Sequence, residues 1–166
     1  MKIFVTVGTT KFTELINIVD SQEFLQLMKK KGVTEITLQT GTEEFEPKEL
    51  KKETNLTVKT FKLVPSIEEY IEKADLIISH GGAGTIFESL RAKKPLIVVV
   101  NDSLMDNHQT ELAEKLAEEK HLFYCENSSF LPTIFKNIEI DGLLPLPDTN
   151  PDKFNSFIDN HFNLKI

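Results

Sequence analysis

A glycine-rich segment in the second half of the chain has the residue types and spacing best suited to hold a ligand. Residues 80–85 read His-Gly-Gly-Ala-Gly-Thr; they follow an apolar run, and a helical pattern begins near Gly84. Glycines let backbone N–H groups approach a ligand closely, and a helix N-terminus offers free N–H groups and a partial positive charge. The segment therefore predicts a phosphate site. Thr85 adds a hydroxyl, His80 adds a donor, and Glu88, one turn on, can reach a sugar hydroxyl beside the phosphate.

Purely structural interpretations compete with this phosphate site. Thr85 and Glu88 have the spacing of a capping box, which needs no ligand, and the three glycines could serve only a tight turn. A dinucleotide-binding fingerprint is disfavoured, because Phe87 stands where its third glycine belongs and the segment follows a late strand. Asp102 does lie about twenty residues on, where that motif places its acidic residue. The sequence has no lysine pattern of the Walker type.

Three further polar segments leave predicted strands at the same edge, namely residues 8–10, 39–42 and 101–109. In an open parallel sheet, ligands bind beyond the carboxyl ends of the strands. The last segment consists mostly of Asn, Asp, His and Gln, which are good donors and acceptors for sugar hydroxyls. The alternative is a polar loop in which Asp106 or Asn107 caps the next helix.

A metal site is another possibility at this edge. Two histidines and two aspartates could converge there, namely His80, His108, Asp102 and Asp106. No two of them share a short ligand spacing on one element, as metal ligands commonly do. The sequence therefore predicts no metal, and it implies no cofactor.

Alternating apolar runs and helical patterns must position these segments. The apolar runs predict strands at residues 3–7, 33–39, 56–61, 75–79, 96–100 and 122–125. Helical spacing predicts helices at residues 12–28, 66–73, 84–93 and 107–120, the second opening with a capping box of Ser66 and Glu69. This alternation predicts a single Rossmann-like α/β domain, with a mostly parallel sheet and helices on both faces. The charged run at residues 43–52 is expected to be a solvated loop or helix face.

Composition narrows the functional classes. A chain of 166 residues is expected to form one domain. A net charge of −7 argues against nucleic acid as a partner and against attraction to an anionic membrane. The single cysteine, Cys125, indicates a reducing compartment and is expected to lie in the core. No signal peptide or membrane span is predicted, so we expect a cytoplasmic protein that reaches a membrane only through a partner.

The regular pattern weakens near residue 138, so we divide the chain into a ligand-binding domain, residues 1–138, and a tail, residues 139–166. Asp141-Gly142 and several prolines indicate an extended tail. A final helix is predicted at residues 152–162, with four apolar side chains on one side: Phe154, Phe157, Ile158 and Phe162. This face either docks a partner or packs against the core of its own domain, and both interpretations stay open.

Together, these motifs resemble the donor-binding domain of GT-B glycosyltransferases, which is the C-terminal half of such enzymes. The matching segments are residues 77–85 (IISHGGAGT), Glu88, residues 94–101 (KPLIVVVN) and residues 107–113 (NHQTELA). They are most similar to the family 28 C-terminal-like domains, and among these to the catalytic subunits of the eukaryotic dolichol-pathway UDP-N-acetylglucosamine transferase (the asparagine-linked glycosylation protein thirteen family). Residues 8–10 and 39–42 fit that family's first two loops, and Pro147, Phe154 and Phe157 fit its tail.

The resemblance implies an activity and a partner. Such an enzyme transfers N-acetylglucosamine from UDP-N-acetylglucosamine (UDP-GlcNAc) to the lipid-linked acceptor GlcNAc-diphosphodolichol, with inversion, to give a β-1,4 linkage. It acts at the cytosolic face of the endoplasmic reticulum membrane. A membrane-anchored partner subunit, similar to asparagine-linked glycosylation protein fourteen, supplies the other half of the GT-B fold and recruits the catalytic subunit.

The resemblance also implies roles for individual residues. The diphosphate would be held by N–H groups and a hydroxyl of four consecutive residues, Gly82, Ala83, Gly84 and Thr85. His80 would lie near the phosphates, Glu88 would accept from the ribose hydroxyls, and Val64 would offer its backbone to uracil. N-acetylglucosamine would be read by Asn107, His108 and Gln109. The cleft between the two halves would be faced by Gly8, Thr9 and Thr10.

Some features stay open at this point. Thr13 follows Phe12 where the family often has Asp, and Glu43 stands in the second loop where a basic residue is common. An inverting transfer needs a general base, and this sequence assigns none, so the partner is expected to supply it. Two alternatives remain, a nucleotide-sugar-binding regulatory module without transferase activity and an epimerase or hydrolase on the same half-fold.

Overall fold

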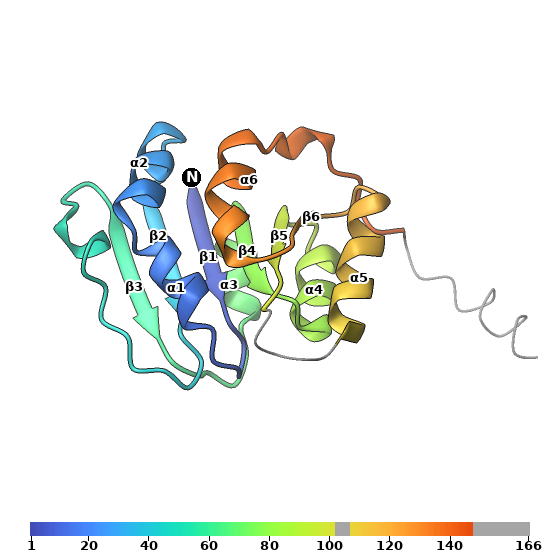
Figure 1. Ribbon diagram of the computed structural model, residues 1–166, viewed down its shortest axis with the longest axis horizontal. Coiled ribbons are helices and arrows are strands. Elements are labelled where there is room, and N and C mark those ends of the chain that lie inside the picture. Colours follow the sequence, from blue (N-terminus) through green and yellow to red (C-terminus); the bar gives the residue numbers. More distant parts are fainter. Residues whose placement is uncertain (102–106, 148–166) are drawn as a thin grey trace, which may run out of the picture.

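The computed structural model describes residues 1–101 and 107–147, with residues 107–109 described by their backbone alone. Within these ranges six strands form one sheet (Figure 1), namely β1 (Lys2–Thr6), β2 (Glu35–Gln39), β3 (Thr57–Phe61), β4 (Leu76–His80), β5 (Leu96–Val99) and β6 (Phe123–Cys125). Their order is β3-β2-β1-β4-β5-β6, and every neighbouring pair is parallel. The predicted Rossmann-like α/β class is confirmed.

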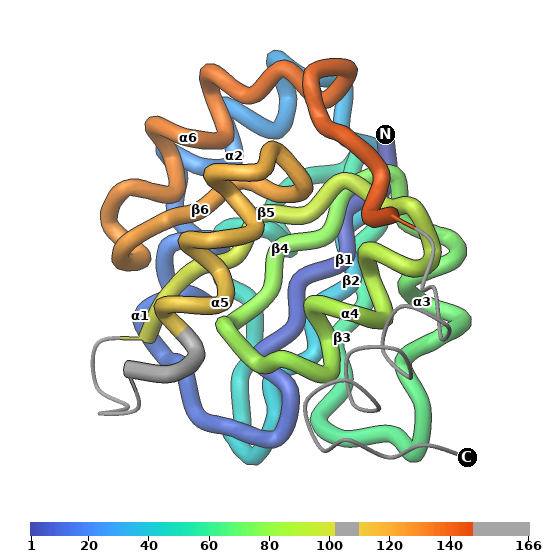
Figure 2. The backbone as a smooth tube through the Cα atoms, turned by 90° about the vertical axis from the view of Figure 1, so that its right-hand side faces the viewer, coloured from blue at the N-terminus to red at the C-terminus, as the bar shows by residue number. Residues whose placement is uncertain are grey.

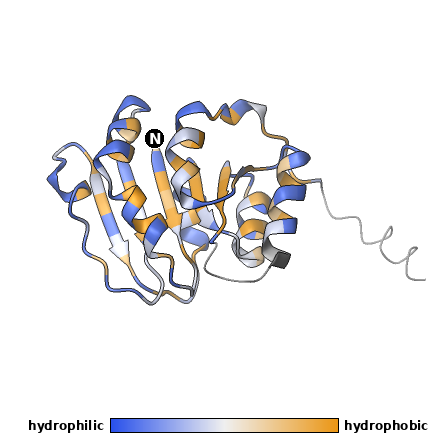
Figure 3. Cartoon of the chain, viewed as in Figure 1, coloured by the Kyte–Doolittle hydropathy of each residue, from blue (hydrophilic) through white to orange (hydrophobic). Residues whose placement is uncertain are grey.

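Helices cover both faces of the sheet (Figures 1 and 2). One face carries α1 (Thr13–Val19), α2 (Gln22–Lys30) and α6 (Leu131–Asn137), and the other carries α3 (Glu68–Lys73), α4 (Ala83–Arg91) and α5 (Asn107–Glu118). Side chains of a strand alternate between the faces, so Ile3 and Val5 enter one core and Phe4 the other. Figure 3 shows apolar colour along the strands and both apolar and polar stretches on the helices.

Local signals explain how a helix such as α2 forms. The Ser21 hydroxyl accepts a hydrogen bond from the Phe24 N–H at 3.2 Å and caps the helix. Phe24, Leu25 and Met28 then recur on one face and are buried. The Phe24 ring meets Phe135 of α6 with 4.7 Å between ring centroids. Burying a side chain of this size contributes about 1.5–3 kcal/mol, so the pairing holds α6 on the sheet.

One local prediction is wrong, and another holds only in part. The capping box of Ser66 and Glu69 does not form, because α3 begins two residues later and the Ser66 hydroxyl accepts from the Glu68 N–H at 3.2 Å. The run at residues 43–52 is not simply a solvated segment. It ends in a short 3-10 turn (Leu50–Lys52) whose Leu50 is fully buried, and the Asp20 carboxylate accepts N–H bonds of 2.7–3.1 Å from residues 48–50.

The described part of the predicted tail lies against the domain. The Leu144 N–H donates to the Lys120 carbonyl at 2.8 Å, and the His121 Nδ1 lies 3.0 Å from the Leu144 carbonyl. A 3-10 turn (Ile140–Gly142) precedes this contact, and another (Ser128–Phe130) precedes α6. The helix predicted at residues 152–162, with its four apolar side chains, lies outside the described residues. In the described part of the chain, no helix is long and apolar enough to cross a bilayer.

Because all strands are parallel, their carboxyl ends lie along one edge of the sheet, the lower edge in Figure 1. The strand order reverses between β1 and β4. In open α/β sheets, ligands bind in the crevice at this reversal point. The fold therefore brings the loops after β1 and β4 to the place where a ligand site is expected.

Candidate functional site

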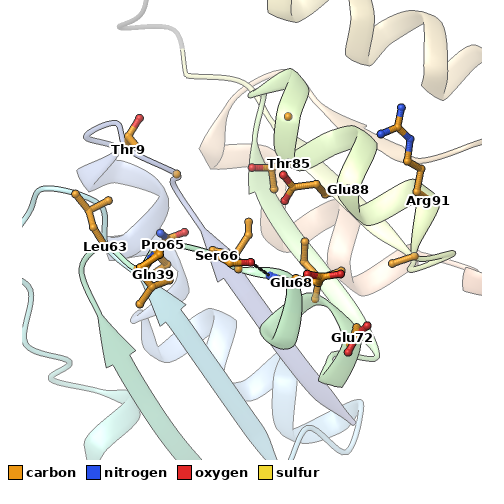
Figure 4. A pocket seen from close by; sticks show the side chains of 16 residues that line it. Thr9, Gln39, Leu63, Pro65, Ser66, Glu68, Glu72, Thr85, Glu88 and Arg91 are labelled. Carbon is orange, nitrogen blue, oxygen red and sulfur yellow. Dashed lines mark hydrogen bonds between the residues drawn. The ribbon is translucent and has the colours of Figure 1, made fainter.

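A cavity of about 700 Å³ opens at the carboxyl edge of the sheet (Figure 4). One wall is formed by the loop after β1 and the segment between β3 and α3, and it comprises Gly8, Thr9 and residues 63–68. The opposite wall is α4, which presents Gly84, Thr85, Glu88 and Arg91. Cavities of this size hold small organic ligands.

The N-terminus of α4 opens on this cavity without a side-chain cap. Gly82 is the N-cap residue, and no side chain accepts from the first helical N–H groups. The capping box of Thr85 and Glu88, the structural alternative, does not form, because Thr85 is the third residue of the helix and not its cap. Ala83 and Gly84 are exposed. Uncapped N–H groups together with the helix dipole favour an anion at this position.

The His80 ring lies between two glycines from different loops. A Cβ added to Gly8 would lie 2.4 Å from His80 Cε1, and one added to Gly82 would lie 2.5 Å from Nε2. His80 is 7% exposed, and its Nδ1 is the only fully buried side-chain polar atom without a hydrogen-bond partner among the described residues. Burial lowers the pKa of the imidazole below its ordinary value, and the backbone of Thr6 offsets only part of this effect. His80 is therefore neutral at pH 7 and joins the two loops by packing.

The loops after β1 and β2 are also locked together. Gly8 and Gly41 have φ of 60° and 63°, in the left-handed region that favours glycine. A Cβ at Gly41 would lie 2.2 Å from the Thr10 carbonyl oxygen. The Thr10 hydroxyl turns inward and donates to the Val7 carbonyl at 2.7 Å. Thr10 thus stabilises its own loop, while Gly8 and Thr9 line the cavity.

A hydrogen-bonded relay connects the ends of β1 and β2. The Gly8 N–H donates to the Thr6 hydroxyl at 3.0 Å, and that hydroxyl donates to Gln39 Oε1. Gln39 is 4% exposed and belongs to the cavity lining. The relay therefore fixes the orientation of a buried amide at the floor of the cavity.

Charge is unevenly distributed along the cavity. Its lining includes three carboxylates, Glu68, Glu72 and Glu88, and one guanidinium, Arg91. Figure 4 shows the Glu88 carboxylate close to Thr85, while Arg91 points away along α4. Glu88 is exposed and can accept hydrogen bonds from a ligand's hydroxyls. The chemistry available is thus N–H donation to an anion at one end and hydroxyl recognition one helical turn further.

The two departures from the family pattern contact each other. The Thr13 hydroxyl donates to the Glu43 carboxylate, and Lys11 lies 3.3 Å from the same carboxylate. The first loop here supplies the donors and the second loop the acceptor, which is the reverse of the acidic and basic pattern expected from the resemblance.

Parts of the predicted site lie outside the described residues. Asn101, at the end of β5, donates from Nδ2 to the Lys11 carbonyl at 3.1 Å and so ties the fourth polar segment to the first loop. α5 begins at Asn107, but the side chains of Asn107, His108 and Gln109 are not described, and neither are residues 102–106. Among the described residues, no three His, Cys, Asp or Glu side chains converge on a possible metal position.

The structure brings most of the remaining predicted site residues together. Six line the cavity, namely Gly8, Thr9, Val64, Gly84, Thr85 and Glu88. Gly82, Ala83 and His80 lie directly beside it, and only Thr10 turns away. The sequence placed Gln39 in a polar segment of this edge without assigning it a role, and Arg91 was not predicted. Gln39 is the last residue of a buried strand and Arg91 lies three residues after Glu88, which are the signals that point to them.

Comparison with known proteins agrees with this geometry. The model of the glycosyltransferase family 28 C-terminal domain matches residues 2–143. The UDP-N-acetylglucosamine transferase subunit ALG13 of Mus musculus is 46% identical over 122 residues, which cover 74% of this chain and 10% of the mouse protein. This chain thus spans about a tenth of that relative's length.

Solved structures show the same fold. The NMR solution structure of ALG13 matches with a TM-score of 0.67 and 28% identity, over 94% of each chain. MurG of Acinetobacter baumannii matches with a TM-score of 0.60 and 20% identity, over 86% of this chain and 42% of MurG. At that identity the likeness to MurG concerns the fold alone.

Proposed function

The chain belongs to the glycosyltransferase family 28 C-terminal domains, and on that premise we propose that it is the donor-binding subunit of an N-acetylglucosaminyltransferase. The donor is UDP-GlcNAc and the acceptor is GlcNAc-diphosphodolichol. The observation that carries the proposal is the uncapped N-terminus of α4, which opens on a cavity of about 700 Å³ with Glu88 one turn away. The ALG13 relatives, whose name describes a UDP-N-acetylglucosamine transferase subunit, support the choice of donor.

The donor fits the cavity in one direction. The diphosphate lies at the N–H groups of residues 83–85, because the Gly82 N–H already donates to the His80 carbonyl at 2.9 Å. The ribose hydroxyls donate to the Glu88 carboxylate. Uracil extends toward Val64 on the opposite wall. The sugar lies toward the start of α5, where Asn107, His108 and Gln109 read its hydroxyls and its acetamido group.

The reaction is an inverting displacement. The acceptor's 4-hydroxyl attacks the anomeric carbon of N-acetylglucosamine, the bond from this carbon to the β-phosphate oxygen breaks, and UDP leaves. Charge develops on the β-phosphate, where fixed N–H donors at residues 83–85 stabilise it without reorganisation. The proton of the attacking hydroxyl passes to a general base on the partner subunit, and the product is β-1,4-linked.

A second, membrane-anchored chain completes this enzyme. Support comes from the word subunit in the relatives' name and from the fold, which is the C-terminal half of a GT-B glycosyltransferase. The partner carries the acceptor side and recruits the chain from the cytoplasm to the endoplasmic reticulum membrane. Residues 1–138 bind the donor and residues 139–166 dock the partner. Deleting residues 151–166 should abolish co-purification with the partner, and unchanged co-purification would contradict the docking role.

Calorimetric titration of UDP-GlcNAc into the purified chain tests the donor site. Glu88→Ala should weaken binding about tenfold or more, because hydrogen bonds to a charged group contribute about 1.5–3 kcal/mol. Gln109→Ala should weaken the binding of UDP-GlcNAc but leave the binding of UDP unchanged, since this residue contacts only the sugar. Glu23→Ala, on the exposed surface of α2, removes the same charge away from the cavity and should have no effect. Equal binding by wild type and Glu88→Ala would refute the site.

A regulatory module that holds the nucleotide sugar without taking part in transfer is the competing function. Transfer of labelled N-acetylglucosamine by the complex with its partner separates the two. If the chain is the donor subunit, Glu88→Ala lowers transfer in proportion to its loss of donor affinity. Full transfer with a variant that no longer binds donor would leave only the regulatory role.

A further inference from the structure

We infer that Gln39 recognises the nucleobase, by donating from Nε2 to the carbonyl oxygen at position 4 of uracil, and so makes the site select uridine over cytidine nucleotides. The inference rests on the proposed function, and it adds a specificity-determining residue that neither the glycine motif nor Glu88 provides. It begins from a buried amide whose orientation the structure fixes.

The relay at the ends of β1 and β2 assigns the two atoms of this amide. The Thr6 hydroxyl accepts the Gly8 N–H at 3.0 Å, so its own proton is directed to Gln39 Oε1. The carbonyl side of the amide is thereby occupied, and Nε2 remains. In this orientation the Thr6 hydroxyl uses both of its hydrogen-bonding roles, since it accepts from the Gly8 N–H and donates to Gln39 Oε1.

Gln39 Nε2 is left available to a ligand. Only 4% of Gln39 is exposed, yet the residue lines the cavity. Within the described residues, no hydrogen bond from Nε2 is found, and it is not among the fully buried atoms that lack a partner. Its N–H groups are therefore reached from the cavity. A buried donor that opens only on a ligand site discriminates strongly, since a ligand without a matching acceptor leaves it unsatisfied.

The topology places this donor under the base. The ends of β4, β1, β2 and β3 lie in this order along the edge, so a ligand that reaches from α4 to Val64 passes over Gln39. Thr40 donates its N–H to the Phe61 carbonyl at 2.9 Å, which keeps Gln39 beside the segment leading to Val64. Figure 4 shows Gln39 beside Pro65 and Leu63, across the cavity from Thr85 and Glu88.

The orientation of the base follows from the position of the ribose. Glu88 holds the ribose at the α4 wall, so the base edge farthest from the ribose points toward β2 and β3. That edge carries the position-4 carbonyl and the N3–H in uracil, whereas cytosine carries a 4-amino group. Nε2 donates to the carbonyl of uracil but meets a second donor in cytosine. The Val64 backbone serves the neighbouring N3 position.

The test compares UDP with CDP, because both carry the same diphosphate and charge effects cancel in their ratio. Wild type should bind UDP at least about tenfold more tightly than CDP by calorimetry, in line with one buried hydrogen bond. Gln39→Glu keeps the shape of the side chain and the acceptor for the Thr6 hydroxyl but replaces the Nε2 donor. The preference for UDP over CDP should therefore fall about tenfold. Gln39→Met removes the donor without adding charge and should lower the preference similarly. Gln26→Glu, exposed on α2, should leave it unchanged.

The outcomes separate this inference from the proposed function. Wild-type binding of UDP with a preference unchanged in both folded Gln39 variants overturns the role of Gln39 and leaves the proposed function intact. Gln39 variants that bind UDP and CDP more weakly by the same factor also overturn the role of Gln39, since such a change reports charge or packing alone. Failure of wild type to bind either nucleotide overturns the proposed function, and the inference falls with it. Thermal melting of each variant establishes that the chain is folded.

Discussion

Gly82→Ala tests whether the glycines of the ligand loops are required first by the His80 ring. The new Cβ would lie 2.5 Å from His80 Nε2 and 2.9 Å from Cε1, distances at which atoms overlap. The ring is held against a second backbone segment as well, since the Cβ position of Gly8 lies only 2.4 Å from its Cε1. Gly82 has φ −67° and ψ 120°, which alanine adopts freely, so any cost arises from the contact and not from the backbone.

The expected magnitude follows from three contributions. Forcing a methyl group into a packed site costs about 1–3 kcal/mol. Alanine is less favourable than glycine at an N-cap by roughly 0.5–1 kcal/mol. The smaller entropy of the unfolded alanine chain returns about 0.4–1 kcal/mol. We therefore expect Gly82→Ala to lower the free energy of unfolding by about 1–2 kcal/mol.

Urea denaturation of four proteins isolates the contact: wild type, Gly82→Ala, His80→Ala and the double variant. With the ring removed, the new methyl group meets empty space, so its cost should fall by about 1 kcal/mol or more. Gly84→Ala is the matched control, because nothing lies within 4 Å of its Cβ position, and it should be neutral or stabilising. Additive effects of Gly82→Ala and His80→Ala, within about 0.5 kcal/mol, would refute the reasoning.

Three further outcomes are expected. Stability should fall as the pH drops below about 6.5, by at most about 1.4 kcal/mol per pH unit. The reason is that the His80 pKa is lower in the folded chain than in the unfolded chain, so the unfolded chain binds the proton first. Urea denaturation at pH 7.5 and pH 5.5 should show this loss in wild type and not in His80→Ala. Asp20→Asn should cost about 1–3 kcal/mol, because one amide oxygen replaces a carboxylate that accepts from residues 48–50; an unchanged urea midpoint would contradict this. Burial raises the pKa of the Cys125 thiol to about 12, so Ellman's reagent should label it at pH 8 only after unfolding, and rapid labelling of the native chain would contradict its burial.

The sheet could be predicted from the sequence because parallel strands buried on both faces read as continuous apolar runs. The run from residue 96 to residue 100 became β5 (Leu96–Val99) with one residue trimmed. α6 escaped prediction for the opposite reason. It has seven residues, with Pro132 in its first turn, so its periodicity is too short to read, and its position depends on Phe24, far away in the sequence.

The part of the candidate site that one continuous segment forms could be predicted from the sequence. The strand, glycines and helix around residues 80–85 place N–H groups at the carboxyl edge whatever the rest of the chain does. Gln39 was not predictable in this way, because its amide is oriented by the Thr6 hydroxyl, 33 residues earlier. Such a role appears only when the order of the strands is known. The contact of Thr13 with Glu43 is hidden from the sequence for the same reason.

The glycine motif itself has a different physical basis from the one that its sequence suggests. The sequence left two roles open for its glycines, namely an opening for a ligand or a tight turn. In the structure, Gly82 leaves room for the His80 ring, as Gly8 does from the other loop, whereas Gly84 faces open space. The ring therefore sets the spacing of the two loops, and Gly84 leaves the end of α4 open, where we propose that the donor's phosphate binds. A larger residue at Gly84 should thus impair donor binding while the fold persists, whereas one at Gly82 should damage the fold first.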